Sequence, residues 1–171
     1  MSLGKENEKL EFKKTTAELK EAIICISAIL NKHSSGELYF GIRNDGIPVG
    51  LTINEKTMRD ISQAVSNHLE PKIYPTISEV NIGDKQCIKV VFAGDDAPYF
   101  AYGRAYIRVA DEVKVMSPSD LEFFILRKNE KKNPWDSVVS NKTLDIIKTG
   151  VLKKYLLRAN NNFGIKLDWI L

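Results

Sequence analysis

The chain of 171 residues has a formal net charge of +3, with 43% hydrophobic and 27% charged residues, an ordinary composition for a soluble protein with one main core. No apolar run approaches the ~18 residues that cross a bilayer, and the first residues do not resemble a signal peptide, so we expect a cytoplasmic protein with no membrane partner. Residues 127–171 hold ten of the 25 Lys and Arg but four of the 22 Asp and Glu, so residues 1–126 carry −3 and the remainder +6. The first part is therefore not a uniformly basic nucleic-acid binder, and contact with phosphates there requires a local patch.

The first elements along the chain are a short strand and a long helix. The strand contains residues 11–13 and directly precedes the helix expected over residues 15–32. Thr15 and Glu18 have capping-box spacing at the start of this helix. Its apolar stripe is wide, which predicts a largely buried helix.

A hairpin is expected next. Residues 37–42 and 47–51 are apolar segments that flank a turn at Asp45-Gly46. Glycine accepts the positive φ that a primed hairpin turn demands, so these two residues predict a tight turn.

Further helices and strands are expected up to residue 128. They are a helix over 54–69, strands over 72–80 and 85–92, a hairpin over 98–109 that turns at Gly103-Arg104, and a helix over 116–128. Ser117 is the expected N-cap of the last helix and Pro118 its first residue. The pattern predicts an α+β fold in which helices pack on a mixed or antiparallel sheet.

The expected domain organisation has three parts. Residues 5–127 form the main domain, residues 128–142 a charged linker, and residues 143–171 a helical extension that we expect to begin a longer C-terminal region. The basic amphipathic stretch over 143–159 fits a DNA-reading segment, a solvated face, or packing against the main domain or a second subunit.

Several common catalytic and metal-binding patterns are not found in the sequence. Cys25 and Cys87 lie in apolar stretches without Cys or His at metal-ligand spacing, so we expect buried free thiols. His33 and His68 lie far apart, with no evident nucleophile partner, and are expected at the surface or at helix ends. The glycines within 41–50 are not followed by Gly-Lys-Ser/Thr, which excludes a P-loop there.

Four blocks of sequence, taken in order, form a recognisable pattern. They are Glu6 with "EFK" at 11–13, "SAILNKHSSGELYFGI" at 27–42, "GIRNDGIPVGL" at 41–51 and "RAYIRVADEVKVMSPSDL" at 104–121. Together they resemble the Schlafen AlbA-like domain, over roughly residues 5–127. The sequence departs from that pattern at Gly36, where many members have two adjacent glycines, and its acidic turn aligns through either Asn44 or Asp45.

The resemblance implies a DNA-binding module of the kind found in bacterial regulators and helicase-related proteins. The basic residues placed to reach a phosphate backbone are Lys13, Lys14, Arg43, Arg104 and Arg108. Tyr102 and Tyr106 can stack on bases if their faces of the strand are exposed. The alternative is that these cations are solvated or pair with neighbouring acids. We therefore expect a nucleic-acid partner, DNA first, a homodimer by analogy with Alba-like proteins, and no cofactor needed for binding.

A second reading is RNA cleavage, because eukaryotic Schlafen relatives include RNA-cleaving members that use acidic residues in this domain. Carried over by motif, Glu6, Glu11 and Asp45 would be catalytic and would hold Mg²⁺ or Mn²⁺, with Lys13 adding positive charge. An odd spacing puts Glu6 and Glu11 on opposite faces of a straight strand, so a bulge or a non-strand segment near Glu6 is required. The alternatives are a frayed terminus at Glu6, a Glu11–lysine pair, or a domain that mainly oligomerises or acts as a scaffold.

Overall fold

The structure is a computed structural model that describes residues 2–132 and 149–163. The chain divides into two units, one up to Lys132 and one from Asn133 onward, and each is described by itself. In the second unit the described element is α4 (Thr149–Phe163). The elements of the first unit, in order, are β1 (Leu10–Lys13), the 3-10 helix η1 (Thr16–Glu18), α1 (Leu19–His33), β2 (Ser35–Phe40), α2 (Glu55–His68), β3 (Leu69–Glu70), β4 (Thr76–Ile82), β5 (Lys85–Ala93), β6 (Phe100–Ala101), β7 (Arg104–Val109), β8 (Glu112–Val115) and α3 (Pro118–Lys132).

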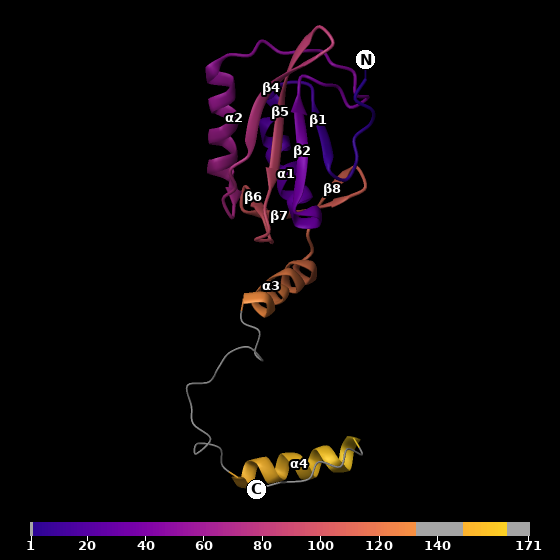
Figure 1. Cartoon of the computed structure of the whole chain (residues 1–171), viewed down its shortest axis with the longest axis vertical. Helices are drawn as coiled ribbons and strands as arrows, with labels where there is room; N and C mark the ends of the chain where they lie inside the picture. The colour runs from indigo at the N-terminus through magenta and orange to yellow at the C-terminus, as the bar shows by residue number, and fades with distance from the viewer. Residues whose placement is uncertain (1, 133–148, 164–171) are drawn as a thin grey trace. The chain divides into compact units, whose positions relative to one another are not determined.

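The strands form two four-stranded sheets rather than the one sheet expected. The first sheet has the order β1-β2-β5-β4 and is mixed, because β1 runs parallel to β2 while the other pairs are antiparallel (Figure 1). The second sheet has the order β3-β6-β7-β8 and is antiparallel throughout. The content is thus α+β, as predicted.

The core is built around α1, which contacts strands of both sheets. Its apolar stripe packs against the inner side chains of β2 and β5, as the wide stripe predicted. The buried residues of this cluster include Ile23, Ile26, Ile29, Leu30, Leu38, Phe40, Ile88, Val90 and Phe92. A helix with this many buried positions fixes the relative placement of the two sheets.

The predicted helix starts are confirmed. Thr15 and Glu18 form the capping box before η1 and α1. Ser117 accepts from the Asp120 N–H, so it caps α3, which begins at Pro118 and extends to Lys132, four residues beyond its expected end. Residues 133–148 of the expected linker and extension lie outside the described part.

The predicted strand over 47–51 is wrong. Residues 41–51 contribute a single bridge, Ile42 to Pro48, flanked by the Arg43 N–H donating to Ile47 O at 3.0 Å. The Val49 and Gly50 amides both donate to the Gly41 carbonyl, at 2.8 and 3.0 Å, so the pairing ends there and no strand forms. The turn before them closes with Gly46 N–H donating to Arg43 O at 2.8 Å, and Gly46 has the predicted positive φ of 79°.

Strand β8 was not predicted, and the turn of the β6–β7 hairpin lies one residue earlier than expected. The hairpin turns at Tyr102-Gly103, where both residues have positive φ, 50° and 74°. The turn into β8 contains Ala110 at φ 56°, which carries none of the glycine signal that marks such turns. None of the described helices is long and apolar enough to span a membrane.

Candidate functional site

A tight reversal before β1 brings Glu6 and Glu11 together. The Asn7 side chain accepts from the Lys9 and Leu10 amides at 2.9 and 3.1 Å, and the Asn7 amide donates to the Leu10 carbonyl at 3.0 Å. Beyond this turn the Glu6 carboxylate accepts from the Phe12 N–H at 2.9 Å. The required non-strand segment near Glu6 is therefore present, and Glu6 is anchored rather than frayed.

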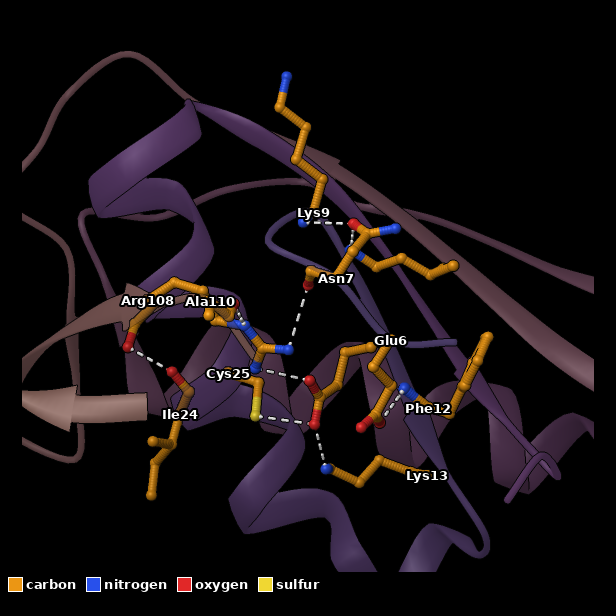
Figure 2. A network of polar contacts seen from close by, with 12 residues as sticks. Glu6, Asn7, Lys9, Phe12, Lys13, Ile24, Cys25, Arg108 and Ala110 are labelled. Carbon is orange, nitrogen blue, oxygen red and sulfur yellow. Dashed lines mark hydrogen bonds and ion pairs between the residues drawn. The ribbon is translucent and has the colours of Figure 1, made fainter. Parts of the chain in front are cut away.

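Glu11 is the centre of a buried polar network. Its side chain has 6% exposure, and it faces α1 from the middle of β1. One oxygen, Oε1, lies 2.5 Å from Lys13 Nζ and accepts from Cys25 Sγ at 3.3 Å. The other, Oε2, lies 2.6 Å from Arg108 Nη1. Figure 2 shows Arg108, Cys25 and Lys13 converging on this one carboxylate.

Arg108 is a structural cation rather than a surface one. It is 1% exposed, and besides Glu11 its guanidinium donates to the Asn7 and Ala110 carbonyls, each at 3.2 Å (Figure 2). The expected phosphate contact is thus not available to it, because the side chain points into the protein. Through Arg108 the network ties the turn before β1 to β7, about a hundred residues later in the chain.

The network sets the charges at neutral pH. Burial raises the pKa of Glu6 above 4.5 and the Glu11 charge raises it further, while the Phe12 N–H opposes the rise. Burial by itself would lower the pKa of Lys13. The Cys25 thiolate, which forms only at alkaline pH, and the Glu11 and Glu6 carboxylates outweigh burial and raise that pKa. Burial and then the Glu11 charge raise the pKa of Cys25 to about 12. Cys25 is therefore a neutral thiol donor, and Lys13 stays an ammonium.

The predicted carboxylate cluster does not form a ready ligand set for Mg²⁺. Both Glu11 oxygens already contact cations, and Asp45 belongs to a different contact, 2.5 Å from Arg43 Nη2, with its other oxygen accepting from Ile47 N–H. Within residues 2–132 and 149–163 no three His, Cys, Asp or Glu side chains lie close enough to hold a metal ion. The metal and catalytic roles stay predictions.

Two of the predicted basic residues share one surface. Lys14 and Arg43 are exposed and line an open hollow of about 380 Å³ together with Asn44 and Asp45. Arg104 is also exposed, at the start of β7, but it does not line this hollow.

The predicted stacking residues differ in their surroundings. Tyr102 is 38% exposed and stacks on the His68 ring at 4.5 Å, and Lys20 Nζ lies 5.7 Å from its centroid. Tyr106 is half-buried, and its backbone carbonyl accepts from the Asn31 side chain.

Two members of the network were missed from the sequence. Cys25 was expected only as a buried thiol, and nothing in its local pattern indicates a hydrogen bond to Glu11. Asn7 carried a usable signal, because Asn side chains bond to backbone amides two residues on and start turns of this kind.

Comparison with known proteins identifies a matching family and solved structures of similar fold. A family model described as Schlafen, AlbA_2 matches residues 6–117. No curated protein matches the chain in sequence. The crystal structure of the DIP2311 protein from Corynebacterium diphtheriae is similar in fold, with a TM-score of 0.56, 12% identity, and coverage of 91% of this chain and 30% of that one.

A second solved structure is the N-terminal domain of an ATP-dependent DNA helicase RecG-related protein from Nitrosomonas europaea. It has a TM-score of 0.41, 21% identity, and coverage of 52% of this chain and 63% of that one. The chain thus spans less than two thirds of the length of either structure. Since the family model covers well over half of the residues, the chain belongs to the Schlafen AlbA_2 family.

Proposed function

We propose that the domain binds nucleic acid through the phosphate backbone, at the surface formed by Lys14 and Arg43. The observation that carries the proposal is that these two exposed cations line one open hollow. Cations that converge on a concave surface can neutralise neighbouring phosphates, which supplies affinity with little dependence on sequence.

The local fold explains why residues 29 positions apart meet at this surface. β1 runs parallel to β2, so Lys13 lies opposite Phe40, and the Gly41 and Ile42 amides donate to the Lys13 carbonyl at 2.8 and 3.2 Å. Lys14 and Arg43 therefore leave the same end of the sheet. Arg43 is 52% exposed and pairs with Asp45, which is a solvated contact that a phosphate can replace.

The inward-facing cations have a supporting role in this proposal. Lys13 and Arg108 neutralise Glu11, so the surface above them does not carry an uncompensated negative charge. We further propose DNA as the partner and a place in a regulatory protein, following the description of related modules in bacterial regulators. RNA is the other possible partner, and the experiment below includes it as a probe.

The experiment is fluorescence anisotropy with double-stranded DNA, single-stranded DNA and RNA of equal length, over a range of salt concentrations. The plot of log affinity against log salt is expected to be steep. The double variant Lys14→Ala/Arg43→Ala is expected to flatten its slope by about 2 and to weaken binding by at least about tenfold. Lys85→Ala/Lys114→Ala is the matched control, because both lysines are about half exposed and pair with a neighbouring acid.

Two results decide against the proposal. Absence of binding to all three probes at low salt removes nucleic acid as the partner and leaves the scaffold reading. Equal losses in the double variant and its control show that binding depends on total charge and not on this surface.

RNA cleavage is the second candidate, and the convergence of Glu6 and Glu11 beside Lys13 is the observation that favours it. The test is incubation of structured RNA with Mg²⁺ or Mn²⁺, comparing the native chain with Glu6→Gln. Gln keeps an oxygen that can accept from Phe12 N–H, so the variant preserves the fold and removes only the charge. Cleavage that persists in the variant, or none in the native chain, eliminates this candidate.

A further inference from the structure

Helix α3 carries an exposed apolar stripe on the side that faces away from the rest of its unit. Its inner side is marked by Lys128, which lies 2.9 Å from Asp96, and by Phe124, which lines a hollow beside Leu30 at the end of α1. On the opposite side Phe123 is 60% and Leu126 55% exposed. Two large apolar side chains one turn apart form a contiguous patch, which costs free energy in water unless something covers it.

Charged residues flank the stripe in a definite order. A helix turns about 100° per residue, so Phe123 and Leu126 project within about 60° of each other. Asp120 and Arg127 lie seven residues apart, so they project along one and the same flank of the stripe within about 20°. Along that flank Asp120 lies in the first turn of α3 and Arg127 two turns later.

We propose that this stripe pairs with the stripe of a second copy of the chain, with the two α3 helices antiparallel about a two-fold axis. When the two-fold axis lies at the height along α3 between Phe124 and Ile125, Phe123 of each copy lies opposite Leu126 of the other. The two layers that result contain one aromatic and one aliphatic side chain each, a combination of volumes that packs well.

Charge complementarity favours a second copy of the chain as the partner, and an antiparallel arrangement of the two α3 helices. In this pairing Asp120 of each copy faces Arg127 of the other, because residues on one flank meet the same flank across the axis. A parallel pairing would instead place Asp120 beside Asp120 of the other copy, and Arg127 beside Arg127. Arg127 is exposed at the edge of the stripe, where its guanidinium lies 6.0 Å from the Phe123 ring.

The first test measures the oligomeric state by sedimentation equilibrium over about a hundredfold range of concentration. The native chain is expected to show a reversible monomer–dimer equilibrium. Leu126→Glu is expected to raise the dimer Kd by about a hundredfold or more, because the apolar contact is lost twice in a symmetric dimer. Ile125→Ser is the matched control, since Ile125 is 43% exposed on the same helix but projects away from the stripe, and it should leave the Kd within about threefold.

The second test reads the direction of pairing. Arg127→Glu places two like-charge contacts in the dimer and is expected to weaken it by about tenfold. Adding Asp120→Arg reverses both charges and is expected to restore the dimer to within about threefold of the native Kd. Circular dichroism of each variant controls for α3, because Asp120 also receives a hydrogen bond from the Ser117 hydroxyl.

Three outcomes overturn the proposal. A chain that is monomeric throughout shows that the stripe is covered by another part of the chain or by a different protein. A dimer that survives Leu126→Glu pairs through another surface. A charge swap that fails to rescue Arg127→Glu, with α3 intact, rejects the antiparallel register. Dimerisation through α3 does not depend on nucleic-acid binding, which is measured separately.

Discussion

Removing the buried cation Arg108 should destabilise the domain strongly. In Arg108→Met the aliphatic part of the side chain keeps nearly its length, so packing changes little while the guanidinium is lost. Glu11 then loses the contact at 2.6 Å, and the Asn7 and Ala110 carbonyls lose donors at 3.2 Å. The variant therefore isolates the contribution of charge and hydrogen bonding in the network.

The magnitude follows from what remains around Glu11. Breaking a buried ion pair by removing one partner costs about 3–5 kcal/mol, because the other charge is left buried without compensation. The Glu11 side chain is 6% exposed but keeps Lys13 at 2.5 Å, which favours the low end of that range. The two carbonyls that lose donors belong to a turn and a strand end, where water can partly replace them. We expect the free energy of unfolding to fall by about 3 kcal/mol.

The assay is urea unfolding followed by circular dichroism at neutral pH, for the native chain, Arg108→Met, Glu11→Gln and the double variant. The double-mutant cycle should give a coupling of about 1.5 kcal/mol or more between Glu11 and Arg108. Lys114→Met is the control, since Lys114 pairs with Glu112 at 3.4 Å on an exposed edge, and it should change stability by less than about 0.5 kcal/mol. A loss below about 1 kcal/mol in Arg108→Met refutes the reasoning.

Three further predictions concern other buried or half-buried polar groups. The folded-state pKa of Glu6 is raised, so its contribution to stability is present below the unfolded pKa and lost as pH rises through the folded one. Glu6→Gln should therefore gain stability relative to the native chain as pH rises above about 4.5. Cys25, with its pKa raised to about 12, and Cys87, with its pKa also raised by burial, should not react with a thiol reagent at about pH 8 until urea unfolds the chain. Asn31→Ala should lower the unfolding free energy by at least about 3 kcal/mol, because Asn31 satisfies the Tyr99 amide and carbonyl and the Tyr106 carbonyl at 2.6, 2.8 and 2.8 Å.

Each of these predictions has its own contrary result. A stability difference between Glu6→Gln and the native chain that does not change with pH contradicts the raised pKa. Rapid labelling of either thiol under native conditions shows that it is reachable and ionised. For Asn31 the control is Asn44→Ala in an exposed turn, and similar losses in the two variants contradict the assigned role of the buried amide.

The sequence alone predicted those features that depend on a few neighbouring residues. Thr15 with Glu18 and Ser117 with Pro118 marked helix starts, because capping satisfies amides within one turn of the chain. Gly46 marked a turn, because the freedom to adopt a positive φ is a property of glycine itself. The family resemblance rested on the same local blocks, and the family match confirms it.

The tertiary structure alone decided which charges act at the surface and which hold the fold together. Lys14 and Arg108 looked alike as strand-end cations, yet one lines an open hollow and the other is 1% exposed beside Glu11. The difference depends on contacts across about a hundred residues and on the burial of β7 against α1, neither of which leaves a periodic trace in sequence. The split into two sheets has the same origin, since pairing partners are set by long-range packing around α1. The charged residues of the candidate site could thus be named from sequence, but the roles of Cys25 and Asn7, and the division into an inner network and an outer basic surface, required the fold.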